Sequence, residues 1–197
     1  MYNIPEILWF MPTAEHVDDP YTDLSNVVPA ARGVVKNLWY SDHGDTNDRR
    51  VVVFNWKTRE EQAHFMGTAD YVEWCFPFIE MANGKTVVGQ YLGSLSTSTS
   101  LTIDPIFNAP STDFLHFTSE RSVPLIKDYV GLLAKCPDCV GWFWGRSVDK
   151  FNQFTLVLIV GWATTQPQHD GISGHLYQCL VYQAKLQSLR HLTYVAV

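Results

Sequence analysis

Long apolar runs are missing from this 197-residue chain. No stretch approaches the roughly 20 apolar residues that a membrane-spanning helix needs; the longest, Leu156 to Val160 with its flanks, has the length of a strand. The first residues, MYNIPEILWFMPTAEHVDD, lack the basic leader and the small-residue cleavage site of a secretory signal. The sequence therefore predicts a cytoplasmic protein with no membrane span.

Positive charge is also scarce. Fourteen Lys and Arg face twenty Asp and Glu, the formal net charge is −6, and the basic residues are scattered. A nucleic-acid binder concentrates basic side chains on one face, so the composition argues against nucleic acid as a partner. The glycine-rich phosphate loops GxGxxG and GxxxxGK[ST] are absent from the sequence, as is the GxSxG nucleophile motif. Nucleotide cofactors are not indicated.

Cysteine is sparse, with four residues, and the only recognisable pair is Cys136-Pro137-Asp138-Cys139. A zinc site would need a second such pair or a spaced His pair, and no HxxxH or HxH occurs. Isolated cysteines in apolar patterns fit a reducing compartment. We interpret the pair as part of a structural corner, and we expect neither a metal nor a cofactor.

Aromatic residues, in contrast, are abundant, with seven Trp, nine Tyr and eleven Phe. Three apolar landmarks recur in the same order at nearly constant spacing. Ile7–Phe10 matches Phe114–Phe117, Asn37–Tyr40 matches Trp142–Gly145, and Val51–Trp56 matches Val157–Trp162, at offsets of 107, 105 and 106. Such a repeat indicates duplication and fusion of one module.

Each half reads as strand–helix–strand–strand–helix–strand. The first has strands at 6–11, 34–41, 50–56 and 85–92 and helices at 19–31 and 58–82, the latter opened by a Thr58–Glu61 capping box. The second has strands at 114–118, 140–147, 154–162 and 189–196 and helices at 122–135 and 166–187. The sequence thus predicts an α+β fold of two ferredoxin-like βαββαβ modules, 1–93 and 113–197. A Ser/Thr/Pro-rich connector, 94–112, joins them, and the two sheets would pack against each other.

The same residues resemble the dimeric α/β-barrel superfamily, which includes antibiotic-biosynthesis monooxygenases, stress-responsive A/B barrels and polyketide cyclases. The resemblance rests on two motifs. One is the corner Val27-Val28-Pro29-Ala30, repeated as Lys135-Cys136-Pro137-Asp138; the other is a strand ending in Trp and followed by a helix containing His. It implies an intramolecular barrel, present as a monomeric pseudo-dimer or its homodimer. It also implies an aromatic-lined pocket in each module and His/Tyr acid–base chemistry without a cofactor.

Three candidate catalytic residues come from the second half. His116 stands in an apolar strand where the first half has Trp9, and imidazole transfers protons near neutral pH. The resemblance favours His175, since Ser173-Gly174-His175-Leu176-Tyr177 is similar to the family's small-residue, His, aromatic pattern, and Tyr177 would polarise a carbonyl. A core role remains the alternative for each.

Further residues are candidates for binding the substrate. Trp142 and Trp144 project from one strand face and would stack on a flat ligand. His64 and Tyr71 lie seven residues apart on a predicted helix and would flank one pocket. His169 points about 120° away from His175 around its predicted helix, so the two cannot face one pocket squarely. His191, on the last predicted strand, would line the second pocket.

Three functions remain open from the sequence. The first is a cofactor-independent enzyme of secondary metabolism that cyclises or isomerises an aromatic or polyketide-like substrate by His/Tyr acid–base catalysis. The second is a cofactor-free monooxygenase of an electron-rich phenol or anthrone, with haem binding a weaker variant. The third is a non-catalytic barrel that binds a hydrophobic aromatic small molecule.

Overall fold

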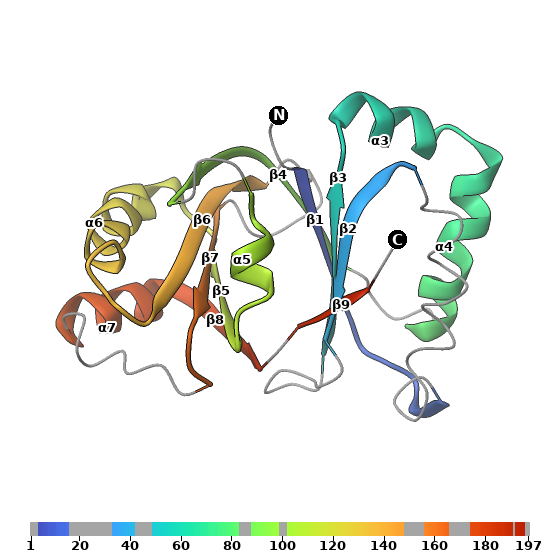
Figure 1. The fold of residues 1–197 in the computed structure, drawn as a ribbon. Coiled ribbons are helices and arrows are strands. Elements are labelled where there is room, and N and C mark those ends of the chain that lie inside the picture. Colours follow the sequence, from blue (N-terminus) through green and yellow to red (C-terminus); the bar gives the residue numbers. More distant parts are fainter. Residues whose placement is uncertain are drawn as a thin grey trace. The chain divides into compact units, whose positions relative to one another are not determined.

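The computed structural model describes residues 4–15, 33–41, 49–82, 88–98, 102–147, 156–165, 174–190 and 192–195 (Figure 1). The chain divides into two compact units. One consists of Met1–Gln90 with Thr193–Val197, and the other of Tyr91–Leu192. Strand β4 (Val88–Thr97) runs across the first boundary, and the last residues return to the first unit. The division into modules 1–93 and 113–197 with a connector at 94–112 stays a prediction.

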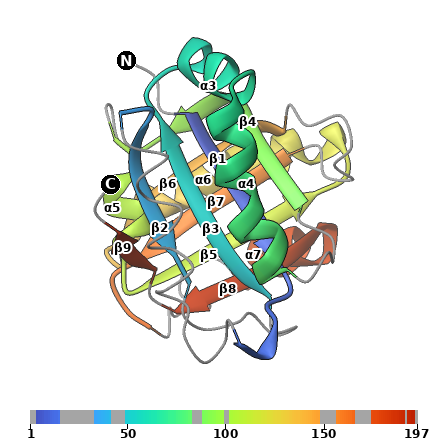
Figure 2. The ribbon, with the colours of Figure 1, turned by 90° about the vertical axis from the view of Figure 1, so that its right-hand side faces the viewer.

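The first unit is built on an antiparallel sheet. Its strand order is β4-β1-β3-β2-β9, with β1 (Ile4–Phe10), β2 (Val35–Tyr40), β3 (Arg50–Trp56) and β9 (Thr193–Val195). All seven residues of β3 are buried, as the continuous apolar run predicts for a strand covered on both faces. Helices α3 (Arg59–Met66) and α4 (Ala69–Met81) follow β3, and Figure 2 shows α4 lying over β1 and β3.

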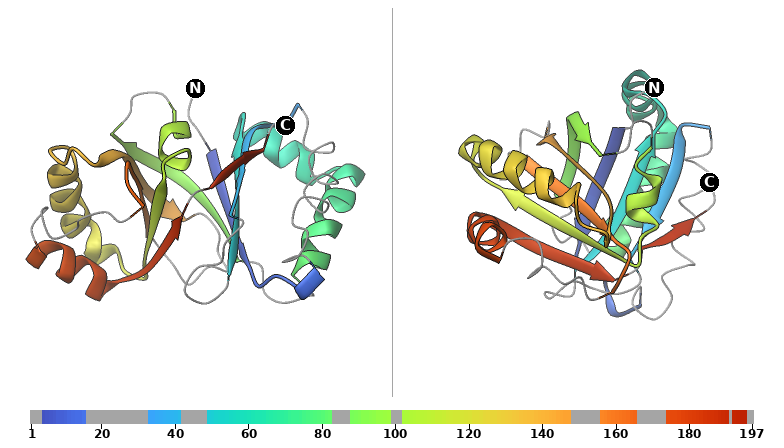
Figure 3. Two further views of the ribbon diagram at one scale, coloured as in Figure 1. Left: turned by 60° about the horizontal axis from the view of Figure 1, so that its bottom comes forward. Right: turned by 60° about the vertical axis from the view of Figure 1, so that its left-hand side comes forward.

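The second unit has the equivalent strand order, β8-β5-β7-β6-β4, in which β5, β7 and β6 take the places of β1, β3 and β2. Its strands are β5 (Ser111–Phe117), β6 (Cys139–Ser147), β7 (Leu156–Trp162) and β8 (Ala184–Arg190). After the short helix η1 (Glu120–Ser122), helices α6 (Val123–Leu133) and α7 (Gly174–Gln183) lie side by side on one face (Figure 3). The short helix α5 (Asp104–Phe107) packs against β6 and β7.

The α+β class with two ferredoxin-like halves is therefore confirmed. Each half has the strand order fourth-first-third-second, given as β4-β1-β3-β2 in one and β8-β5-β7-β6 in the other. The predicted helix 19–31 lies outside the described residues. The packing of one sheet against the other stays a prediction.

Two predicted helices differ in extent from the observed ones. The predicted helix 58–82 is two helices, because α3 ends at Gly67 and the Thr68 side chain accepts a hydrogen bond from the Tyr71 backbone to start α4. The Thr58 cap is confirmed, since its hydroxyl accepts from the Glu61 backbone N–H at 3.0 Å. The predicted helix 166–187 extends too far, because residues 184–190 form β8 and pair with all of β5. This pairing overrides the helical propensity of the Ala-Lys-Leu-Gln stretch.

The predicted connector contains regular structure. Strand β4 continues to Thr97, and its Leu95 pairs with Gly145 of β6. Ser98 then makes three hydrogen bonds with the Trp142 backbone. Its N–H donates to the carbonyl and its hydroxyl oxygen accepts from the N–H, both at 2.9 Å, and its hydroxyl also donates to the carbonyl at 3.2 Å. The composition suggested an aperiodic segment because Ser and Thr are frequent, but β-branched Thr also suits a strand.

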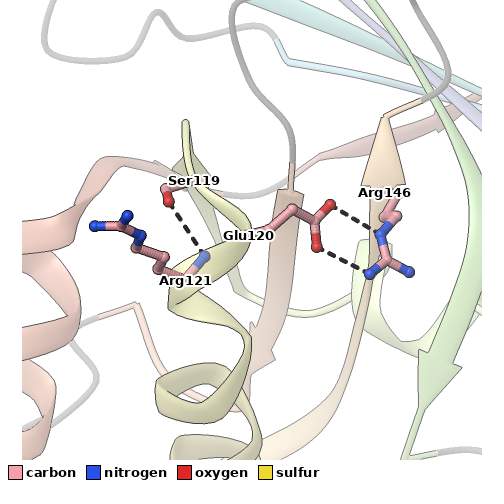
Figure 4. Close-up of polar contacts among 4 residues, drawn as sticks. All are labelled: Ser119, Glu120, Arg121 and Arg146. Carbon is pink, nitrogen blue, oxygen red and sulfur yellow. Dashed lines mark hydrogen bonds and ion pairs between the residues drawn. The ribbon is translucent and has the colours of Figure 1, made fainter.

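An ion pair joins the start of α6 to strand β6 (Figure 4). Arg146 Nε and Nη2 each donate to a carboxylate oxygen of Glu120 at 2.9 Å, and the guanidinium lowers the pKa of that carboxyl. The Ser119 hydroxyl oxygen caps η1 by accepting from the Arg121 backbone N–H. Both charged side chains are exposed, so the pair orients the helix start and adds little stability.

Two glycines of the second unit differ sharply in the space around them. A Cβ on Gly161 would lie 2.7 Å from the carbonyl oxygen of Ile106 and 2.9 Å from its Cα, whereas one on Gly131 in α6 would meet nothing within 4 Å. We expect Gly161→Ala to lower the free energy of unfolding by about 2 kcal/mol, because α5 must move. Gly131→Ala is the matched control and should raise stability by up to about 1 kcal/mol. Equal urea midpoints for the two variants would contradict the packing of α5.

Among the described residues, no helix is long and apolar enough to cross a membrane.

Candidate functional site

Each half buries a carboxylate on the helix-facing side of its sheet. Glu6 lies on β1 and Asp113 on β5, at 4% and 2% exposure. Strand residues alternate between faces, so Glu6 shares its face with Leu8 and Phe10, and Asp113 shares its face with Leu115 and Phe117. Those apolar residues belong to the clusters beneath the helices. The two acids occupy equivalent places, because they precede the matching landmarks Ile7–Phe10 and Phe114–Phe117.

A tryptophan holds each carboxylate. Trp56 Nε1 donates to Glu6 Oε2 at 2.7 Å, and Trp162 Nε1 donates to Asp113 Oδ2 at 2.9 Å. Both tryptophans end the third strand of their half, and each is 1% exposed. A buried carboxylate is costly unless it accepts hydrogen bonds. The indole N–H groups therefore stabilise the acids and fix their orientation.

A tyrosine from the second helix completes the arrangement in each half. Tyr71 on α4 and Tyr177 on α7 are partly buried. Burial is the main cause that raises the pKa of both hydroxyls. At Tyr71, a hydrogen bond to Cys75 and the negative charge of Glu6 raise the pKa further. At Tyr177, the negative charge of Asp113 does so. Both hydroxyls consequently stay protonated at neutral pH and serve as hydrogen-bond donors. Each half thus contains an acid, a tryptophan and a tyrosine, which we call its acid–Trp–Tyr set.

The first set is packed with aromatic rings. Trp74 on α4 is 3% exposed and lies with its ring centroid 5.0–5.8 Å from five neighbouring rings: Phe54, Trp56, Phe65, Tyr71 and Phe78. Gln62 Nε2 also donates to Glu6 Oε2, at 3.3 Å. Tyr71 donates its hydroxyl hydrogen to Cys75. Its donor is thereby already engaged within the protein.

The second set has different neighbours. Leu180 stands at the position that corresponds to Trp74, and the ring of Tyr129 from α6 lies 6.1 Å from that of Tyr177. Trp142 and Trp144 of β6 pack against the same cluster. The Trp142 Nε1 atom is buried and has no acceptor among the residues that the structure describes. An N–H group in this state, which Trp74 Nε1 beside the first set shares, can donate to an oxygen of a ligand.

The structure brings some predicted residues together and separates others. Tyr177, Trp142 and Trp144 lie around one cluster, and the prediction that the two tryptophans share a face is confirmed. His116 is 1% exposed but lies on the opposite face of β5, because its neighbours Leu115 and Phe117 point to the helices. It is therefore not beside Tyr177.

Of the remaining predicted residues, the structure describes the side chain of His64 alone, and the other three histidines stay predictions. His64 is exposed in the last turn of α3, and the break at Gly67 removes the common helix face that it was to share with Tyr71. His175 lies in the first turn of α7, but its side chain is outside the described part. His169 and His191 are also outside the described residues.

Sequence reasoning missed Glu6, Asp113 and Tyr129. A signal for the acids was present, since both repeat landmarks extend by one residue to an acid, Glu6 before Ile7 and Asp113 before Phe114. The two tryptophans shared by the halves, Trp56 and Trp162, were recognised in the sequence only as the ends of the third repeat landmark. Their hydrogen bonds to the acids give them a further role.

The tyrosine environment predicts an unusual titration. Burial raises the pKa of Tyr71, Tyr129 and Tyr177 above the ordinary value. At about pH 11, where free tyrosine is largely ionised, we expect absorbance at 295 nm to show these three still protonated. Unfolded tyrosines lose their protons near pH 10, so the stability that this burial contributes is complete below about pH 10 and lost as the pH rises. Tyr177→Phe should leave the titrated amplitude at pH 11 unchanged; a smaller amplitude would contradict the assignment.

Among the described residues, no group of three or more His, Cys, Asp or Glu side chains could hold a metal ion.

Three solved structures share the fold along nearly the whole chain. A "putative monooxygenase" from Fusobacterium nucleatum has a TM-score of 0.65 at 11% identity, covering 98% of this chain and 95% of that one. An anthrone oxidase-like protein has a TM-score of 0.67 at 10% identity, with 99% and 94% covered. A "putative monooxygenase" from Lactobacillus acidophilus has a TM-score of 0.56 at 10% identity, with both chains fully covered.

No protein-family model matches the sequence, and no curated protein sequence is similar to it. At 10–11% identity the structural likeness shows the fold. The chain therefore shares the fold of these structures, with two ferredoxin-like halves in tandem.

Proposed function

We propose that the chain is a cofactor-free oxygenase of an electron-rich phenol or anthrone, and that its second unit is the active one. The observation that carries the proposal is that the buried carboxylate of Asp113 lies close to the hydroxyls of Tyr129 and Tyr177, whose pKa values its charge raises. Both tyrosines belong to the aromatic cluster under the helices or pack against it. A carboxylate in apolar surroundings is a general base, and hydroxyl donors stabilise the anion that it creates. The names of the structural neighbours, two monooxygenases and an anthrone oxidase-like protein, support the oxygenation branch.

The aromatic residues of the second unit suit a flat apolar substrate. Trp144 and Tyr129 offer ring faces, and apolar pockets with a few polar groups bind such ligands. Tyr177 and Trp142 would donate hydrogen bonds to the substrate oxygen. Tyr177 suits this role because its hydroxyl lies close enough to Asp113 for the charge of that carboxylate to raise its pKa. Trp142 suits it because its indole N–H finds no acceptor in the described residues.

The first step is removal of a proton from the activated carbon of the substrate. Asp113 accepts the proton, and the electron pair of the broken C–H bond moves onto the carbonyl oxygen of the anthrone. Trp162 holds the carboxylate in place through its 2.9 Å hydrogen bond. Negative charge therefore passes from the aspartate to an oxygen that faces Tyr177 and Trp142, where hydrogen-bond donors stabilise it.

Oxygen then reacts with the substrate anion. The anion gives one electron to O₂, the two radicals combine into a C–O bond, and the peroxide anion takes the proton back from Asp113. Removal of the second C–H proton by Asp113 breaks the O–O bond and forms the new carbonyl. The hydroxide that leaves takes up this proton as water, so anthrone and O₂ give anthraquinone and one H₂O.

The test uses anthrone as the probe and measures oxygen with an electrode and quinone by absorbance. We expect the protein to consume one O₂ per quinone formed, at a rate that is proportional to its concentration and well above that of buffer alone. No quinone above the buffer rate would overturn the proposal. Hydrogen peroxide released in equal amounts would also overturn it, because the proposed balance releases water alone.

Cyclisation or isomerisation is the second candidate, because it begins with the same proton transfer. The acid and its two donors suffice for this step without oxygen. A polyketide-like or enolisable aromatic substrate converted equally fast under argon and under air would favour this candidate. Tight binding of anthrone with no turnover in either atmosphere would instead favour the non-catalytic barrel.

A further inference from the structure

The turn between α6 and β6 holds two cysteines close together. It comprises Cys136-Pro137-Asp138-Cys139, and the backbone N–H of Cys139 donates to the carbonyl of Cys136 at 3.2 Å. A turn closed by this bond keeps its first and fourth Cα atoms within about 7 Å. A disulfide needs a Cα separation of about 4.4–6.8 Å. The backbone therefore already brings the two cysteines into bridging range.

The two halves differ in sequence at this point. The corresponding residues of the first half, Val28-Pro29-Ala30, include the same proline but no thiol. The thiols of Cys136 and Cys139 are free and partly buried. They pack against the cluster that contains Tyr129 and Trp142, and ionisation of either thiol would raise the pKa of Tyr129. The pair therefore lies next to the aromatic cluster of the second unit.

A metal does not account for this pair. Two thiols are too few for a structural zinc site, which needs four ligands. In the part of the chain that the structure describes, no group of three or more His, Cys, Asp or Glu side chains could hold a metal ion, and Asp138 between the two thiols does not complete one. Two thiols in bridging range outside any metal-ligand group react by thiol–disulfide exchange.

We infer that Cys136 and Cys139 are a site of reversible oxidation, which a peroxide converts into a disulfide within the turn. The thiolate of Cys136 attacks the peroxide, forming a sulfenic acid and releasing water or an alcohol. The thiol of Cys139 then attacks that sulfur, the S–S bond forms, and a second water leaves. Two electrons pass from the thiols to the peroxide, and a dithiol reductant returns them.

The surroundings set the pH range of this reaction. Burial is the main cause that raises the pKa of Cys139 to about 11, and the neighbouring Cys136 is the second. The thiolate is the nucleophile, so the Cys139 thiol reacts slowly at neutral pH. We expect disulfide formation to become faster as the pH rises from 7 toward 10.

The test treats the full-length folded protein with hydrogen peroxide, blocks free thiols with N-ethylmaleimide, and maps the peptides by mass spectrometry. Trypsin cleaves after Lys135 and Arg146, so one peptide carries both cysteines. We expect this peptide to lose two hydrogen atoms and to gain no label, and dithiothreitol should restore both labels. Cys75 and Cys179 are the internal controls, since each lies alone in the sequence and should take the label throughout.

Two outcomes would overturn the inference. One is full labelling of both cysteines after peroxide treatment that oxidises a small-molecule dithiol. The other is sulfinic acid at one cysteine with the label at its partner, which would mean that the two sulfurs do not meet. The readout is the wild-type peptide, so it depends neither on a variant that folds nor on turnover of anthrone.

Discussion

Replacing Asp113 with asparagine should reduce the turnover of anthrone by about 100-fold or more, the usual contribution of a positioned general base. The carboxylate is 2% exposed, and its charge reaches both Tyr129 and Tyr177. Asparagine has nearly the same shape and keeps an oxygen that accepts the hydrogen bond from Trp162 Nε1, so the fold should persist. The amide cannot take a proton from carbon. The measurement is initial quinone formation at saturating anthrone, with circular dichroism as the check on folding.

The duplicated chain supplies the matched control for this variant. Glu6 accepts the equivalent hydrogen bond from Trp56 in the first half. There Trp74 and its ring neighbours surround the set, and Tyr71 donates to Cys75. We expect Glu6→Gln to retain turnover within about twofold, since it alters no residue of the proposed base and donors. Loss of turnover in Glu6→Gln with normal turnover in Asp113→Asn would move the active site to the first half.

Replacing Trp162 with phenylalanine should lower the free energy of unfolding by about 3 kcal/mol. A smaller aromatic ring fills the position, but the buried carboxylate loses its charge-assisted hydrogen bond from Trp162 Nε1, and hydrogen bonds to buried charged groups are worth more than neutral ones. Urea unfolding at neutral pH measures the change. The same substitution in an Asp113→Asn background should cost about 1 kcal/mol, because a neutral amide tolerates the loss of one donor better.

Trp142→Phe is the control for this stability measurement. It removes the same indole N–H, but that group has no acceptor in the described structure, so about 1 kcal/mol or less should be lost. Equal destabilisation by the two Trp→Phe changes would show that ring volume, and not the bond to Asp113, determines the cost.

Much of the fold could be predicted from the sequence, because both halves keep their apolar strands at the same spacing although their sequences differ. The landmarks ending in Trp56 and Trp162 do end equivalent strands, β3 and β7. Ends of helices were less accessible. The apolar spacing continues through Gly67, where α3 stops. The start of β8 at Ala184 depends on pairing with β5, which local sequence does not encode.

The site was predicted only in part, for a physical reason. A search for differences between the halves selected His116, whereas the acid–Trp–Tyr set is common to both. A single acid in an apolar strand shows its role only when its strand face and its partner are known. The two-residue period did place Trp142 and Trp144 on one face, and the resemblance supplied Tyr177. The face of His116 depended on knowing which side of β5 the helices cover.

Hydrogen–deuterium exchange at the reacting carbon of anthrone tests the central claim most directly, because it isolates proton transfer by Asp113 from the oxygen step. The measurement follows the loss of that C–H signal by NMR in D₂O without oxygen. We predict that the wild-type protein and Glu6→Gln accelerate exchange well above the buffer rate, and that Asp113→Asn does not. Equal exchange in Asp113→Asn and the wild type would contradict the account, as would exchange at the buffer rate in all three proteins.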